Sequence, residues 1–154
     1  NYEEKKVRSC TRGKLSFIPK MKTHFNPKNN PRVIIIQKLY GKFYNEDDDI
    51  TFPKHRFKKF IKDIVSGTIE RNDLILEELN NKLGDEFIID NLDKVFETIL
   101  KAATYEFLYK PNISINIIIK EYLNSSNFFL EDSQTKYLNA LLDNIGKKLR
   151  TLNA

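Results

Sequence analysis

The apolar residues of this chain recur at the spacing of an α-helix, and this periodicity constrains the fold more than any other feature. The clearest stripe lies in residues 133–150, where five aliphatic side chains follow the helical period: Leu138, Leu141, Leu142, Ile145 and Leu149. Side chains at these spacings share one face of a helix, and an apolar face packs against a core. The segment therefore predicts an amphipathic helix.

An earlier helix is expected to begin at Asn30 and Pro31. Asparagine caps a helix start well, and proline suits the first helical position because its missing N–H has no partner within the helix. The run Ile34–Ile36 that follows would also suit a β-strand, since β-branched residues favour strands. No partner strand is evident nearby, so the helix is the preferred interpretation.

Three further stretches carry the helical pattern between residues that start or end helices. They are residues 53–83 with a break near 66–67, residues 91–109, and a stretch that begins at Ser114 as its N-cap. Gly84 is the expected C-cap of the first of these. With no internal repeat and no hairpin turn, helix-on-helix packing is the architecture that remains. The sequence predicts an all-α fold, a compact bundle of about five to seven helices.

Basic residues are concentrated at the N-terminus. Residues 1–32 hold nine Lys and Arg and two acids, whereas the whole chain has a net charge of +5. Residues 1–30 lack periodicity and contain two prolines, which predicts a basic, flexible extension ahead of a helical domain at 31–150. A basic arm on a near-neutral body is typical of polyphosphate binding, although a solvated tail explains it equally well. Met21 is the only methionine, and one hypothesis is that translation starts there.

The sequence contains no recognisable catalytic or metal-binding motif. Its single cysteine excludes an internal disulfide, and the two histidines, His24 and His55, lack a second ligand at metal-binding spacing. No apolar run approaches the ~20 residues of a membrane span. We therefore expect a cytoplasmic protein that is not an enzyme, with no cofactor and no membrane partner.

Two carboxylates stand within otherwise apolar helical stretches. Glu106 lies between Tyr105 and Phe107, and Glu121 lies beside Tyr122. Paired carboxylates can perform acid–base catalysis. The alternatives, which we prefer, are a hydrogen bond that bridges two helices or a contact with a partner.

Three blocks of sequence resemble the NusB family of transcription antitermination factors. The first is Arg32-x4-Gln37-x-Leu39-Tyr40, which is similar to the family pattern R-x4-Q-x-L-Y. The second runs from Leu100 to Phe107 and continues from Asn112 to Tyr122, and the third covers Glu131 to Asp143. A weaker match joins them, with Phe60-x3-Ile64-Val65-x-Gly67 resembling F-x3-LV-x-G. The resemblance covers about residues 31–150.

The chain also departs from the family pattern. Ala140 replaces the glycine of FVNGVLD, Tyr137 replaces its aromatic residue, and Lys120 replaces the asparagine of VAINE. The segment between Tyr44 and Phe52 is too short for the family's second helix. These departures concern the RNA surface more than the fold.

The resemblance implies a fold of two small helical subdomains and a function. NusB proteins pair with a small-subunit ribosomal protein, NusE, bind single-stranded boxA RNA in ribosomal RNA transcripts, and act on the transcribing RNA polymerase complex. Carried onto this chain, RNA contacts are implied for one set of residues: Lys22, Lys28, Arg32, Gln37, Tyr40, Asp132, Lys136 and Tyr137. Partner contacts are implied for Tyr105, Glu106 and Glu121.

General chemistry agrees with this assignment, because single strands are held by basic grooves and by aromatic faces on which bases stack. Taken alone, however, each tyrosine would more simply be a core residue. Two other functions stay open. One is the N-terminal RNA-binding domain of a ribosomal RNA cytosine methyltransferase, and the other is a helical module that binds only protein.

Overall fold

The computed structural model describes residues 29–44, 49–85 and 87–151. These ranges contain six α-helices, one 3-10 turn and no strand, which confirms the all-α prediction. The elements are α1 (Pro31–Tyr44), α2 (Lys58–Glu70), α3 (Asn72–Leu83), η2 (Ile89–Asn91), α4 (Lys94–Tyr109), α5 (Ile115–Ser126) and α6 (Asp132–Thr151). The predicted extension at 1–30, with Lys22, Lys28 and Met21, lies almost wholly outside the described residues.

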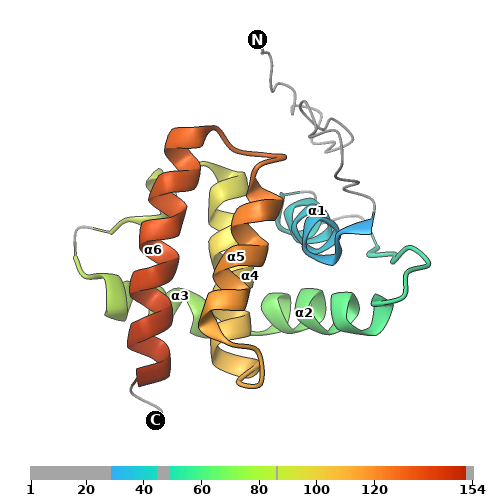
Figure 1. Cartoon of the computed structure of the whole chain (residues 1–154), viewed down its shortest axis with the longest axis horizontal. Helices are drawn as coiled ribbons and strands as arrows, with labels where there is room; N and C mark the ends of the chain where they lie inside the picture. Colours follow the sequence, from blue (N-terminus) through green and yellow to red (C-terminus); the bar gives the residue numbers. More distant parts are fainter. Residues whose placement is uncertain (1–28, 45–48, 86, 152–154) are drawn as a thin grey trace.

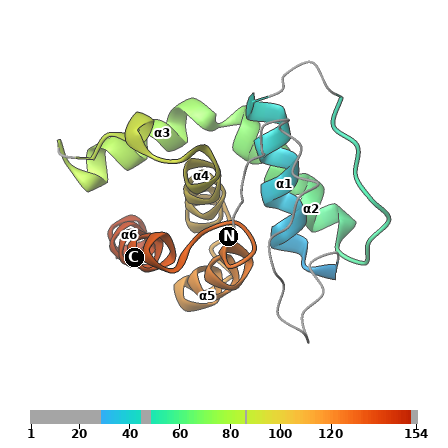
Figure 2. The same cartoon turned by 90° about the horizontal axis from the view of Figure 1, so that it is seen from above.

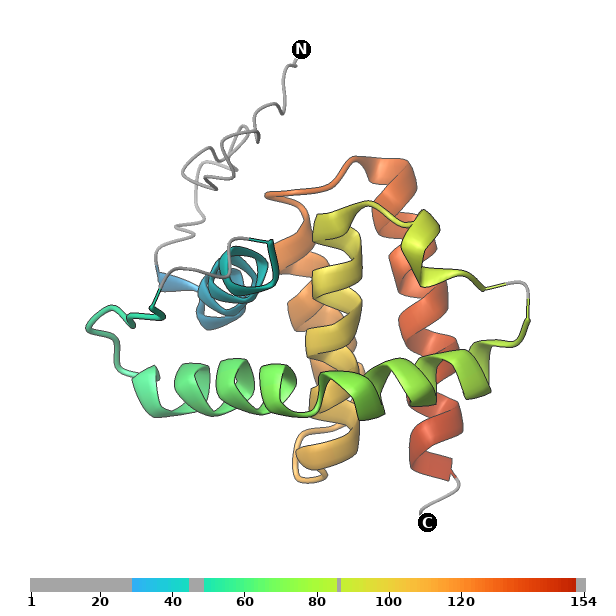
Figure 3. The same ribbon diagram turned by 180° about the vertical axis from the view of Figure 1, so that it is seen from behind.

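The helices form two groups that meet at α4. Helices α4, α5 and α6 make a three-helix bundle, while α1 and α2 pack together on one side of it (Figures 1 and 2). Helix α3 continues the path of α2 and crosses α4 to reach α6 (Figure 3). The two groups correspond to the two subdomains that the family resemblance implied.

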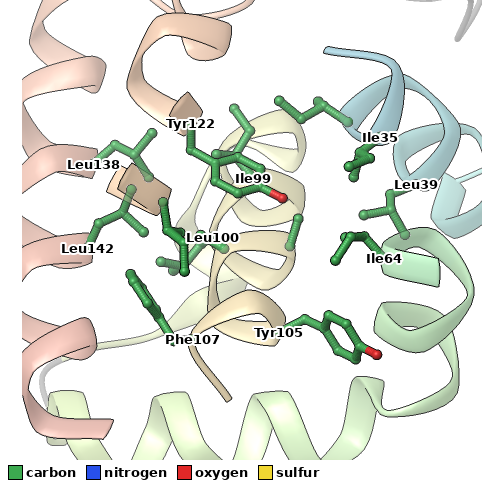
Figure 4. Close-up of a cluster of buried hydrophobic side chains, with 14 of the residues drawn as sticks. Ile35, Leu39, Ile64, Ile99, Leu100, Tyr105, Phe107, Tyr122, Leu138 and Leu142 are labelled. Carbon is green, nitrogen blue, oxygen red and sulfur yellow. The ribbon is translucent and has the colours of Figure 1, made fainter. Parts of the chain in front are cut away.

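One continuous core joins the two groups, and α4 lies at its centre. All twelve residues from Phe96 to Phe107 are buried, and α4 contacts each of the other five helices. Its side chains point in different directions, with Tyr105 towards α2 and Phe107 towards α6, while Tyr122 of α5 enters from another side (Figure 4). A helix that is buried on all sides also buries its charged residues, and these need partners inside the protein.

Several predicted helix ends are confirmed. The side-chain oxygen of Asn30 accepts hydrogen bonds from the backbone N–H groups of Arg32 at 2.8 Å and Val33 at 3.2 Å. The Ser114 hydroxyl accepts one from Ile117 at 3.2 Å. Gly84 follows α3 with a φ of 87°, a conformation that disfavours other residues.

The predicted start and break of the long second helix were wrong. Helix α2 begins at Lys58 and not at Pro53, because the imidazole of His55 accepts the Phe57 N–H at 2.9 Å and holds the chain in a turn. The break lies at Arg71 and not near Gly67. Of the segment between Tyr44 and Phe52, which was expected to be too short for a helix, residues 49–52 are described and contain none.

Arg150 connects the end of α6 to the end of α4 through hydrogen bonds. Its guanidinium donates to the backbone oxygens of Phe107 at 2.8 Å, Ile113 at 2.9 Å and Lys110 at 3.0 Å. Burial lowers the pKa of this group. Basic residues in the last turn of a helix commonly interact with the dipole of their own helix. Arg150 instead satisfies carbonyls at and after the end of α4.

Candidate functional site

Helix α1 carries the pattern R-x4-Q-x-L-Y, and its arginine points into the protein. Arg32 is 7% exposed. Its Nη2 atom lies 2.7 Å from Oε1 of Glu106 on α4, and its Nε atom lies 3.2 Å from Oε2. The Tyr122 hydroxyl on α5 donates to the same carboxylate. Three helices are thus joined by one buried ion pair and its hydrogen bonds, which we call the buried network.

Aromatic rings complete the surroundings of the Arg32 guanidinium. Its central carbon lies 5.0 Å from the ring centre of Phe60 and 5.5 Å from that of Tyr122. Burial alone would lower the pKa of Arg32, but Tyr122 and the hydrogen-bonded Glu106 raise it overall. Burial and the Glu106 charge raise the pKa of Tyr122 well above its ordinary value. The arginine therefore stays charged and the tyrosine stays protonated.

This geometry corrects two of the implied contacts. The Arg32 side chain is enclosed and bound to Glu106, so it is not placed to hold a phosphate. Glu106 has no exposed surface, and Arg32 and Tyr122 occupy its oxygens, so a partner cannot contact it in this conformation. The structure supports the hydrogen bond that bridges helices, one of the preferred alternatives.

The other implied partner residues, Tyr105 and Glu121, occupy different environments. Tyr105 is 6% exposed, and its ring lies so close to Gly67 of α2 that a Cβ atom there would overlap it. This close approach explains the glycine of the pattern F-x3-LV-x-G. Glu121 is half-buried on α5, close enough to Arg32 to contribute to its raised pKa.

The far end of α1 is open to solvent. Tyr40 and Tyr44 lie one turn apart on the same face, with ring centres 5.1 Å apart, and Tyr44 is 37% exposed. The Lys94 ammonium, in the first turn of α4, lies 5.4 Å from the centre of the Tyr44 ring. Partial burial and the nearby Glu97 carboxylate raise the pKa of Tyr44.

Helix α6 brings a third tyrosine to the start of α4. Tyr137 is 48% exposed and stacks on Phe96 with ring centres 5.4 Å apart and planes 25° apart. Because α4 lies between α1 and α6 (Figure 2), Tyr44 and Tyr137 flank its first turn. We call Tyr40, Tyr44, Lys94 and Tyr137 the aromatic surface.

The remaining implied RNA residues lie near this surface or on a neighbouring face. Asp132 and Lys136 are exposed in the first turns of α6. Gln37 lines a cleft of about 330 Å³ between α1 and residues 49–51, together with Lys38 and Lys42. Tyr40 and Tyr137 are therefore brought to the two sides of one helix end, whereas Gln37 opens onto a separate cleft.

Two members of the aromatic surface were missed by the sequence analysis. Tyr44 follows Tyr40 by four positions, so extending the helical pattern by one turn would have found it. The sequence could not predict a role for Lys94, because only the crossing of α1 and α4 brings its side chain to Tyr44. Among the described residues, no cluster of three or more His, Cys, Asp or Glu side chains could hold a metal ion. None of the described helices has the length and apolar character of a membrane span.

The fold and this surface define a small helical bundle with exposed aromatic rings and basic side chains gathered at one end of its central helix. The chain belongs to the NusB family, whose sequence model matches residues 29–147. This confirms the resemblance drawn from the sequence blocks.

Individual relatives support the same conclusion. The transcription antitermination protein NusB of Sinorhizobium fredii is 30% identical over 114 residues, which cover 74% of this chain and 66% of that protein. NusB of Novosphingobium aromaticivorans is 30% identical over 105 residues, or 68% of this chain and 70% of that protein. The chain spans only 61% of the length of NusB from Sphingopyxis alaskensis.

A solved structure of T. maritima NusB has the same fold. It superposes with a TM-score of 0.67 at 22% sequence identity, covering 80% of this chain and 92% of that one.

Proposed function

We propose that this chain is an RNA-binding transcription antitermination factor. It holds single-stranded boxA-like RNA jointly with a small-subunit ribosomal protein acting as NusE, within the transcribing RNA polymerase complex in the cytoplasm. Membership of the NusB family and similarity to proteins named transcription antitermination protein NusB support this proposal. The observation that carries it is the aromatic surface, in which exposed tyrosine rings lie next to a lysine.

The chemistry of each residue suggests its role. Tyr40, Tyr44 and Tyr137 offer rings on which unpaired bases stack, and each stacked base contributes about 1–3 kcal/mol. Lys94 and Lys136 would neutralise phosphates, together with Lys22 and Lys28 of the N-terminal extension. Gln37 and Asp132 would read base edges, since an amide can both donate and accept and a carboxylate accepts from base amines. Arg32 is left out of this set because it is buried.

The protein partner would contact the surface around Glu121, because the Tyr105 side chain, like that of Arg32, is buried. Glu106 supports this region from inside through Arg32 and Tyr122 and makes no direct contact. Glu121 offers the more accessible carboxylate of the two. This arrangement predicts that RNA and the ribosomal protein bind to different helix faces, so that both can be held at once.

A fluorescence titration with boxA-like single-stranded RNA, with and without the ribosomal protein, tests the proposal. We expect weak, salt-sensitive binding alone and tighter binding with the partner. Tyr40→Ala should weaken binding roughly 5- to 150-fold, the equivalent of losing one stacked base. Leu74→Ala, which truncates an exposed apolar side chain on α3, is the matched control and should bind like the parent. The proposal is wrong if the partner gives no enhancement at moderate salt.

A further inference from the structure

A second charged surface lies at the start of α2, away from the aromatic surface. Between residues 54 and 62 the chain has five basic side chains and no acidic one. All five are exposed: Lys54, Arg56, Lys58, Lys59 and Lys62. Among the described residues, none of them forms an ion pair. Like charges that are gathered without counter-charges repel one another, and a bound polyanion relieves this repulsion.

An exposed aromatic ring stands among these cations. Phe57 is 46% exposed, although a phenylalanine is ordinarily buried. The guanidinium carbon of Arg56 lies 4.9 Å from the centre of its ring, and the His55 ring lies 5.8 Å away. A ring framed by cations is the arrangement on which nucleic-acid bases stack, since the ring takes the base and the cations take the phosphates.

The charged surface at the start of α2 also forms a groove. Arg56, Phe57, Lys59 and Lys62 line an open groove of about 800 Å³ that extends to Asp63 and Lys110. Asp63 pairs with Lys110, so the one carboxylate in the groove is already neutralised. Besides this ion pair, the groove therefore presents three basic side chains and one exposed ring. We call it the α2 groove.

The position of the α2 groove separates it from the aromatic surface. His55 lies 3.1 Å from the backbone oxygen of Asn29, which places the groove beside the beginning of α1. The aromatic surface lies at the other end of α1, which has 14 residues and is thus about 21 Å long. The two surfaces are far enough apart to hold different nucleotides of one strand.

We propose that the α2 groove binds single-stranded RNA as a second contact, with Arg56, Lys59 and Lys62 on phosphates and Phe57 stacked on a base. The inference rests on the proposed function in that RNA is the ligand. It goes beyond that function because it assigns RNA contacts to a part of α2 that neither the family resemblance nor the aromatic surface includes. The charge of the groove favours RNA over a protein, because Arg56, Lys59 and Lys62 line it beside an exposed ring and have no counter-charge among the described residues.

The test is a fluorescence titration of the full chain with single-stranded RNA at several salt concentrations. A triple variant, Arg56→Gln, Lys59→Gln and Lys62→Gln, removes three proposed phosphate contacts. Each phosphate contact to a single strand contributes about 0.7 to the slope of log affinity against log salt, so this slope should become shallower by about 2. Phe57→Ala should weaken binding roughly 5- to 150-fold and leave the slope unchanged.

A second triple variant is the charge-matched control. Arg71→Gln, Lys147→Gln and Lys148→Gln remove the same charge from exposed positions, one between α2 and α3 and two on α6, and should leave the slope near that of the parent. Exposed substitutions of this kind change stability by about 0.5 kcal/mol or less, so all variants should fold. Circular dichroism of each variant checks this.

The outcomes separate this inference from the proposed function. If the α2 variants bind RNA like the parent while Tyr40→Ala loses affinity, the groove inference is wrong and the proposed function stands. If the α2 variants lose affinity while Tyr40→Ala does not, the groove is the RNA site and the stacking role of Tyr40 is wrong. If the α2 variants keep RNA affinity but lose the ribosomal protein, the groove binds protein and the inference is overturned. Absence of RNA binding by the parent overturns both.

Discussion

The two ends of α1 place their polar and aromatic side chains in opposite environments, one buried and one open to solvent. At its beginning, Arg32 is buried against Glu106 and Tyr122, and every polar atom of that carboxylate is used inside the protein. At its end, Tyr44 lies beside Lys94 and is partly open to solvent, and the half-buried Tyr40 packs against Tyr44. The difference teaches that a family pattern such as R-x4-Q-x-L-Y can combine a structural residue with surface residues on one helix.

The path of α1 across α4 causes this difference in burial between the two ends of α1. The beginning of α1 packs where α2, α4 and α5 meet, so a side chain there is surrounded. The end of α1 passes the first turn of α4, where the bundle ends and solvent begins (Figure 2). A charged side chain at the buried beginning of α1 needs an oppositely charged partner, because an unpaired buried charge is strongly destabilising.

The largest expected effect comes from breaking the buried network. Glu106→Gln would leave the Arg32 charge buried without its counter-charge, and removing one partner of a buried pair costs about 3–5 kcal/mol. The measurement is the free energy of unfolding in urea. Glu77→Gln, an exposed carboxylate on α3, is the control and should change it by no more than about 0.5 kcal/mol. An equal loss in both variants would show that the network has no special role.

A smaller effect is expected from the Tyr122 hydroxyl, and it depends on pH. Tyr122→Phe removes a hydrogen bond to a buried carboxylate, which should lower the free energy of unfolding at pH 7 by about 1–3 kcal/mol. The raised pKa of Tyr122 means that the folded protein keeps a proton that the unfolded chain releases near pH 10. Its contribution is therefore complete below about pH 10 and is lost as the pH rises further.

Urea titrations between pH 7 and pH 11 measure this dependence. The parent should lose stability above about pH 10, and Tyr122→Phe should lose less over the same range. Tyr137→Phe removes one hydroxyl from the open end of the molecule and is the control for the loss of a tyrosine hydroxyl at pH 7. A variant at Tyr122 whose profile runs parallel to that of the parent would contradict the assignment.

The smallest effect on stability is expected at the open end. Tyr137→Ala removes the stacked contact with Phe96, and an aromatic pair of this kind contributes about 0.5–1.5 kcal/mol. Affinity for single-stranded RNA should nevertheless fall roughly 5- to 150-fold. Thermal unfolding and RNA titration of the same sample measure the two effects. A large loss of stability together with unchanged RNA affinity would place Tyr137 with the buried residues and remove the contrast between the ends.

The sequence predicted the helical content of this chain because helix formation leaves a local signature. The periodic apolar stripe of α6, the Asn30 cap and the Gly84 end all depend on residues within a few positions of one another. Helix α2 shows the limit of such reasoning. Its start is delayed by His55, which contacts both Phe57 and the distant backbone of Asn29.

What the sequence by itself determined was the all-α class, most helix ends and, through its motifs, the NusB family. Only the tertiary structure decided which polar residues face inward. Arg32 and Tyr40 look equally available in the sequence, but their exposure depends on where α1 crosses α4. The pairing of Arg32 with Glu106 joins positions 74 residues apart. Burial and ion pairing arise between helices, and no local pattern within one helix contains them.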